Sequence, residues 1–125
     1  MELRWPKWIG VVADDLEKQR RFYRDTLGFR ETASTERYID FRMPDGGVFE
    51  LVRRDASPQY GGKRFQVGFT VDDIRKAREE LIDRGAEIVS EIEGLEPGSK
   101  NLWCYFRDPE GNFFEITQWL KDPEG

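Results

Sequence analysis

The sequence predicts an α+β fold made of two tandem βαβββ modules with mixed sheets. The first observation is a repeat: FRMPDGGVFEL at residues 41–51 returns as FRDPEGNFFEI at residues 106–116. A second repeat starts each copy, because WIGVVADDL at residues 8–16 returns as QVGFTVDDI at residues 66–74. Strand-like and helix-like segments also follow one another in the same order in both copies. Together these observations indicate a duplicated structural unit.

The first module is expected at about residues 5–53 and opens with a strand at residues 8–13. Asp14 is expected to cap the following helix, because Glu17 three residues later completes a capping-box pattern. Gly28 is expected to end that helix. Three strands are then predicted at residues 29–32, 37–43 and 48–52, with PDGG as the turn between the last two.

The second module is expected at about residues 64–120, after a linker at about residues 54–63. Its elements repeat the same order, with Gly85 ending the helix. They are predicted as a strand at 65–71, a helix at 72–84 and strands at 87–91, 101–106 and 113–119. The whole chain, residues 1–125, has the length of a single domain.

The composition excludes several partners. A net charge of −5 disfavours nucleic acid, whose binding depends on clustered basic residues. No apolar run approaches the roughly 20 residues of a membrane helix, and the first residues lack the pattern of a signal peptide. A soluble cytoplasmic protein is therefore expected. Cys104 lies among aromatic residues, which predicts a buried structural thiol.

Strand alternation predicts which side chains share a surface. In the last predicted strand Glu115 alternates with apolar residues, and Glu50 does the same between Phe49 and Leu51. Since the apolar residues should face the helices, both glutamates are expected on the opposite face of the sheet. The same alternation places Trp103 and Tyr105 on the side of Glu115.

Two motifs carry a family resemblance. FYRDTLGF at residues 22–29 and YFRDPEGNFFEI at residues 105–116 resemble the vicinal oxygen chelate superfamily, which includes type I glyoxalases, bleomycin resistance proteins and extradiol dioxygenases. The resemblance extends over nearly the whole chain, from Trp5 to Leu120. It implies that the two modules form a cup, which is usually completed by dimerisation in that family.

The resemblance also implies a set of positions for a metal. Active members of the family bind a divalent ion through one residue on the first strand and one on the last strand of each module. These positions hold Trp8, Glu50, Gln66 and Glu115 in this chain. Because the chain contains no histidine, the extradiol oxygenation and the fosfomycin thiol transfer that the resemblance would suggest are excluded.

No cofactor is favoured, because Trp8 would fill the fourth metal position with an indole that coordinates nothing. If a divalent cation binds, Glu50, Gln66 and Glu115 are its candidate ligands. Such an oxygen-rich set would suit Mg²⁺, Mn²⁺ or Ca²⁺.

Two further interpretations of the glutamates stay open. Arginines such as Arg42 or Arg107 can hold the carboxylates on the concave face as ion pairs. Alternatively, two carboxylates that face each other raise one another's pKa, which gives a general acid or base near neutral pH.

Two hypotheses about function follow. In the first, the protein binds a small planar molecule without catalysis, as in the bleomycin resistance branch that it resembles, and its acidic net charge favours cationic or neutral ligands. In the second, it is a divalent-metal-dependent lyase or isomerase of the glyoxalase type, in which Glu115 is the catalytic residue. The expected ligand-binding residues are Trp8, Glu50, Gln66, Trp103, Tyr105 and Glu115.

A homodimer is expected on physical grounds. Each module leaves sheet edges and an aromatic-rich face that need to be covered. Closed twofold association is the commonest way to cover them. At least one of Trp5, Trp8 and Trp103 should therefore lose most of its exposure at the dimer interface or in the cup.

Overall fold

The computed structural model describes residues 1–121 and has the predicted α+β fold. Its α-helices are α1, Leu16–Arg21, and α2, Ile74–Asp83. Its strands are β1, Arg4–Ala13; β2, Arg30–Ser34; β3, Tyr38–Arg42; β4, Val48–Arg53; β5, Phe65–Thr70; β6, Glu87–Ile88; β7, Asn101–Arg107; and β8, Phe113–Trp119. No helix in this part of the chain is long and apolar enough to cross a membrane.

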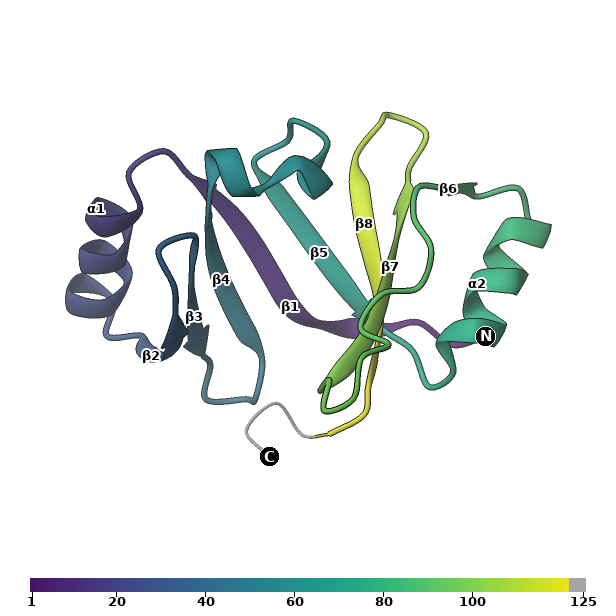
Figure 1. Ribbon diagram of the computed structural model, residues 1–125, viewed down its shortest axis with the longest axis horizontal. Coiled ribbons are helices and arrows are strands. Elements are labelled where there is room, and N and C mark those ends of the chain that lie inside the picture. The colour runs from purple at the N-terminus through teal and green to yellow at the C-terminus, as the bar shows by residue number, and fades with distance from the viewer. Residues whose placement is uncertain (122–125) are drawn as a thin grey trace.

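One mixed sheet of eight strands runs through the described residues in the order β2-β3-β4-β1-β5-β8-β7-β6. β1 is parallel to β4 and β5 is parallel to β8, whereas β1 and β5 are antiparallel to each other. The pairing of β1 with β5 joins the two halves of the chain within one molecule. Figure 1 shows α1 and α2 at opposite ends, with the strands between them.

One face of the sheet packs against the helices. On the α2 side, Ile74 and Ala77 pack against buried residues of β7 and β8, namely Leu102, Cys104, Phe106 and Ile116. On the α1 side, the buried core consists of Ile39, Phe41 and Leu51, with Tyr23, Phe29 and Phe49 packed against it. Because neighbouring residues of a strand point to opposite sides, the polar residues between these core positions turn to the other face.

α1 begins one residue later than the capping pattern predicts, and α2 begins at Ile74, two residues after its predicted start at residue 72. Asp15, not Asp14, caps α1, and its carboxylate accepts a hydrogen bond from the Lys18 amide at 3.0 Å. The Asp14 carboxylate is ion-paired with Arg54 instead, which holds it away from the helix end. Asp73 caps α2 in the same way, through the Lys76 amide at 3.2 Å.

The helix ends agree with the prediction. After α1 the chain continues as a π-helical turn, Phe22–Thr26, in which the Leu27 amide donates to the Phe22 carbonyl at 3.1 Å. Gly28 follows at φ 75°, and Gly85 follows α2 at φ 90°. Both are left-handed conformations that glycine adopts at low cost.

The connection between the halves is more structured than a linker. It contains two short 3₁₀ turns, Arg54–Ala56 and Pro58–Tyr60, which lay Tyr60 across β1. The Tyr60 ring is 1% exposed and packs against Val12 and Val52, and it meets the Trp8 ring edge-on at a centroid distance of 6.2 Å. A Cβ atom on Gly10 would lie 1.8 Å from the Tyr60 hydroxyl, so only glycine fits there.

Gly10→Ala is therefore expected to destabilise the protein by about 2 kcal/mol, because the added methyl group must displace the Tyr60 side chain or β1. Urea denaturation measures this loss. Gly47→Ala is the matched control, since a Cβ atom there would meet its nearest neighbour only at 3.4 Å. A Gly10→Ala variant as stable as the Gly47→Ala variant would show that Tyr60 does not depend on this space.

Candidate functional site

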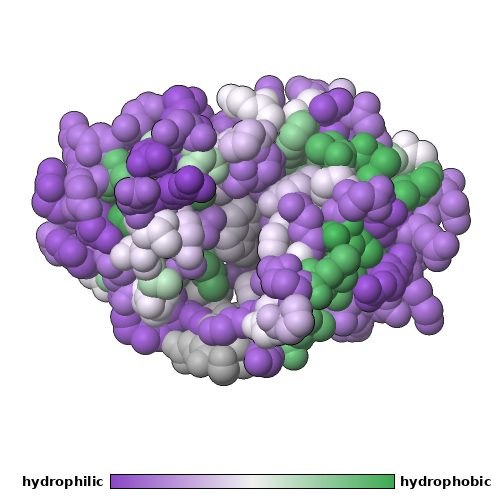
Figure 2. All heavy atoms as spheres, viewed as in Figure 1, coloured by the Kyte–Doolittle hydropathy of each residue, from purple (hydrophilic) through white to green (hydrophobic). Residues whose placement is uncertain are grey.

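A pocket of about 790 Å³ opens on the face of the sheet that points away from the helices. Residues from both halves of the chain line it, and the surface is hollowed near the centre of Figure 2. The lining residues are Trp8, Arg30, Thr32, Ala33, Asp40, Arg42, Val48, Glu50, Gln59, Lys100, Asn101, Trp103, Tyr105, Glu115 and Trp119.

Strand register explains how distant residues meet in this pocket. Trp8 lies opposite Gly68 across the β1–β5 pair, Gly68 lies opposite Glu115 on β8, and Glu115 lies opposite Tyr105 on β7. Side chains in such a row share one face of the sheet. A Cβ atom on Gly68 would lie 2.8 Å from Oε1 of Glu115, so this glycine provides the space for the carboxyl group.

The structure places five of the six expected ligand-binding residues in the pocket lining, and Gln66 is the exception. The Gln66 side chain is 2% exposed, and its Nε2 donates to the Gln59 carbonyl at 2.7 Å. Its Oε1 is buried without a hydrogen-bond partner among the described residues. Gln66 thus ties the connection between the halves to β5 and lies behind the pocket surface.

Glu115 is a buried carboxyl group. It is 6% exposed and accepts a hydrogen bond from the Thr117 hydroxyl. Burial raises the pKa of Glu115 to about 7, because the charged form is desolvated, and the Thr117 hydrogen bond opposes this rise only in part. The charge of Glu93 raises the pKa further. Near neutral pH this carboxyl group therefore both holds and releases a proton.

Glu50 faces Asp40 directly across the β3–β4 pair, and both line the pocket. Burial is the main cause that raises the pKa of each, and for Glu50 the neighbouring Asp40 and the charge of Glu115 raise it further, to about 10. Two carboxylates so placed cannot both ionise cheaply. Glu50 is consequently neutral at pH 7, and its proton is engaged in a side-chain hydrogen bond to Asp40.

Glu50 and Glu115 therefore differ in protonation although they occupy equivalent positions. The charge of Glu115 raises the pKa of Glu50, so the two groups are close enough to interact. Glu115 ionises first, while Glu50 is still uncharged, and for this reason the reverse effect is small. The pocket holds one carboxyl group whose proton is engaged with Asp40 and one that exchanges its proton near neutral pH.

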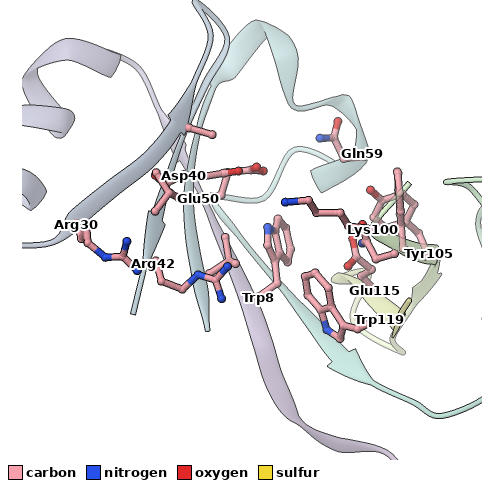
Figure 3. Close-up of a pocket in the computed structure, with 15 residues that line it drawn as sticks. Trp8, Arg30, Asp40, Arg42, Glu50, Gln59, Lys100, Tyr105, Glu115 and Trp119 are labelled. Carbon is pink, nitrogen blue, oxygen red and sulfur yellow. The ribbon is translucent and has the colours of Figure 1, made fainter. Parts of the chain in front are cut away.

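Several pocket residues were missed by sequence reasoning. Asp40 sits between Ile39 and Phe41 just as Glu50 sits between Phe49 and Leu51, so strand alternation carried a signal for it. Arg30, Lys100 and Trp119 had no comparable signal, because their positions depend on how the strands pair. Figure 3 shows Trp8 and Trp119 on one side of the pocket and Lys100 extending toward them.

The arginine interpretation of the glutamates receives no support from Arg107. Its Nη1 contacts Glu87 Oε2 at 3.0 Å on β6, and its guanidinium lies 4.9 Å from the centre of the Phe113 ring. Arg42 does lie at the pocket wall, where its Nη1 donates to the Gly46 carbonyl at 3.0 Å.

The residues at the four implied metal positions do not fit a metal centre. Trp8 supplies no donor atom toward an ion, and the Gln66 amide is held by Gln59 behind the pocket surface. Within residues 1–121, no group of three or more Asp, Glu, His or Cys side chains is placed to hold a metal ion.

Comparison with known proteins gives one family match and several relatives. The model of the Glyoxalase/Bleomycin resistance protein/Dioxygenase superfamily matches residues 5–116. The uncharacterized protein YwkD of Bacillus subtilis (strain 168) is 31% identical over 114 residues, which cover 82% of this chain and 87% of YwkD. A glyoxylase-like domain-containing protein of Didymella fabae is 28% identical over 119 residues, which cover 86% of this chain and 88% of that protein.

Solved structures share the fold at low identity. A glyoxalase/bleomycin resistance protein/dioxygenase superfamily member from Vibrio splendidus 12B01 has a TM-score of 0.70 at 18% identity, covering 94% of this chain and 99% of that one. A methylmalonyl-CoA epimerase has a TM-score of 0.71 at 18% identity, covering 97% of this chain and 99% of that one. At such identities the likeness concerns the fold alone.

The pKa of Glu115 predicts a pH-dependent stability. Because folding raises this pKa from 4.5 to about 7, the native state binds the proton more tightly, and stability should fall as pH rises through this interval. Glu50 contributes in the same direction up to about pH 10. Glu115→Gln should remove the contribution of Glu115 to this pH dependence. The stability of the variant relative to the wild type should therefore rise by roughly 2–3 kcal/mol between about pH 5 and pH 8.

Urea unfolding at a series of pH values measures this slope. Glu110→Gln, in the exposed turn before β8, is the control and should keep the wild-type slope. If the Glu115→Gln variant also kept the wild-type dependence of unfolding free energy on pH, Glu115 would not be the group that titrates near neutral pH.

Proposed function

Because this chain belongs to the glyoxalase/bleomycin resistance protein/dioxygenase superfamily, we propose that it binds a small, partly aromatic molecule in the 790 Å³ pocket, without a metal ion. The observation that carries the proposal is a set of aromatic rings from both halves of the chain, lying beside largely buried carboxyl groups. Pockets of this size, with aromatic walls and a few convergent polar groups, are typical of small-molecule sites.

Trp8 is the main aromatic surface in this proposal. Its ring is held edge-on by Tyr60, which is itself buried, so the indole is fixed before a ligand arrives. A preorganised ring loses little conformational entropy when another flat ring stacks on it. Trp103 and Tyr105 line the same pocket from β7.

The carboxyl groups supply the polar contacts. Glu115 donates a hydrogen bond when it is protonated and accepts one when it is ionised, whereas the proton of Glu50 is engaged with Asp40. Because both groups are buried, a hydrogen bond left unmade would be costly. Glu115 thus favours ligands with a carbonyl or hydroxyl next to the ring.

A second candidate function is proton transfer, as in a lyase or isomerase. The raised pKa of Glu115, about 7, favours it, because a base of this pKa is effective at neutral pH. Glu115 would remove a proton from the carbon next to a carbonyl group, whose oxygen takes up the negative charge. Turnover that survives Glu115→Gln would argue against this candidate. A stoichiometric divalent metal in protein purified without chelator would support the metal-dependent alternative.

Ligand binding is tested by titrating small aromatic compounds, both neutral and charged, while tryptophan fluorescence and thermal stability are followed. Trp8→Leu should weaken the binding of any compound found by about tenfold, since it removes the stacking surface. Trp5→Leu is the matched control, because Trp5 is 87% exposed and does not line the pocket. If no compound quenches the fluorescence or shifts the stability, the proposal fails.

The homodimer stays a prediction. Trp5, Ile9 and Phe65, on the central strands β1 and β5, are 87%, 39% and 66% exposed in the single chain, and apolar surface of this kind is commonly covered by association. Light scattering at micromolar concentration should therefore give the mass of a dimer. Trp5→Lys should shift it toward the monomer, and a wild-type protein that is already monomeric would contradict the prediction.

A further inference from the structure

The space beside Gly10 lies among the residues at the implied metal positions. Gly10 on β1 lies opposite Glu50 on β4 and opposite Gln66 on β5. Since paired residues of neighbouring strands present their side chains on the same face, Glu50 and Gln66 flank this space from two sides. The ring edge of Trp8 borders it as well, because Cη2 of Trp8 lies 2.6 Å from the position of a Cβ atom on Gly10. Three of the four implied metal positions therefore surround one space.

The Tyr60 side chain occupies this space. A Cβ atom on Gly10 would overlap with the Tyr60 hydroxyl oxygen, so the hydroxyl lies directly beside the glycine. The 3₁₀ turn Pro58–Tyr60 brings the ring there from the connection between β4 and β5, which is visible in Figure 1. Tyr60 is buried, and its hydroxyl is therefore removed from water at the place where an ion would have to bind.

Two polar atoms around this space have no hydrogen-bond partner among the described residues. They are the Tyr60 hydroxyl and Oε1 of Gln66, and both side chains are buried. Nε2 of Gln66 donates to the Gln59 carbonyl, so Oε1 is the oxygen of a fixed amide. Buried polar atoms are nearly always paired, and two unpaired ones near a single glycine need an explanation. The space has the polar character of a ligand site, although a tyrosine fills it.

The connecting segment also joins the two halves of the chain, as a shared metal ion would. The Tyr60 ring packs against Val12 on β1 and Val52 on β4, in the first half. Gln59, in the same turn, accepts the hydrogen bond from Gln66 on β5, in the second half. An ion at the implied positions would be held by both halves as well. The turn therefore links the halves at this place without an ion.

We propose that Tyr60 takes the place of the metal ion that the family implies: its hydroxyl occupies the space between Glu50 and Gln66, and its turn holds the two halves together there. This inference rests on the metal-free part of the proposed function and does not depend on which ligand binds. It has two consequences. The Tyr60 hydroxyl should exclude any side chain at position 10, and an ion should bind in this space only after the Tyr60 ring has been removed.

A double-mutant cycle followed by urea denaturation tests the first consequence. In a Tyr60→Phe background, Gly10→Ala should lower the urea midpoint by roughly half as much as in the wild type, because the hydroxyl that meets the new methyl group is gone. Tyr38→Phe is the matched background, since Tyr38 packs against the same core cluster, and there Gly10→Ala should keep its full effect. An equal loss in all three backgrounds would show that the Tyr60 hydroxyl does not occupy this space, and would overturn the inference.

Co²⁺ binding, followed by visible absorption and thermal stability, tests the second consequence. Trp8→His replaces the indole with an imidazole, which is a good ligand for such ions. The double variant Trp8→His/Tyr60→Leu should bind Co²⁺ about tenfold more tightly than Trp8→His alone, because no side chain then has to leave the space. Leucine keeps apolar packing against Val12 and Val52. Trp8→His/Tyr38→Leu is the matched control and should bind Co²⁺ no better than Trp8→His.

The outcomes separate this inference from the proposed function. If Trp8→His binds Co²⁺ as tightly as Trp8→His/Tyr60→Leu, or if the folded double variant binds no Co²⁺, Tyr60 does not take the place of an ion. If that double variant does not fold, the Gly10→Ala cycle alone decides. If the wild-type protein binds Co²⁺ as tightly as the double variant, the inference and the metal-free part of the proposed function both fail. A wild-type protein that binds aromatic compounds but fails these tests keeps the proposed function and loses the inference.

Discussion

The antiparallel pairing of β1 with β5 is the contact on which the rest of this structure depends. It sets β4 on one side of the central pair and β8 on the other, so Glu50 and Glu115 enter the same pocket from opposite halves. Backbone hydrogen bonds and the two helix-side cores stabilise this arrangement. They offset the desolvation of the carboxyl groups, which on their own would disfavour such a pocket.

The duplicated framework is filled differently in its two halves. Gly10 and Gly68 occupy corresponding positions on β1 and β5, and each leaves a space beside the sheet. Tyr60 from the connecting segment fills the space at Gly10, whereas the Glu115 carboxyl fills the space at Gly68. Glu50 therefore lies beside a phenol ring and Asp40, while Glu115 lies beside Thr117. These surroundings, rather than the repeated sequence, give the two glutamates different pKa values.

The sequence was informative wherever the decisive pattern is local. Alternation within a strand placed Glu50, Glu115, Trp103 and Tyr105 on one face, because the period of two follows from strand geometry alone. The sequence did not reveal that Asp40 opposes Glu50 or that Arg30 opposes Arg42, since register between strands is set by the assembled sheet. Gln66 was expected beside the ligand but lies under the connecting segment, whose 3₁₀ turns have no clear signature in the sequence.

The outer strands of the sheet limit how the molecule can grow. β6 comprises only Glu87–Ile88, and the register of β2 shifts between Glu31 and Ala33, so both ends of the sheet offer a short or irregular edge. Such edges are poor templates for a further strand. A fold that arose by joining two copies through their strands is thereby protected from adding more copies in the same way and from growing into a fibre.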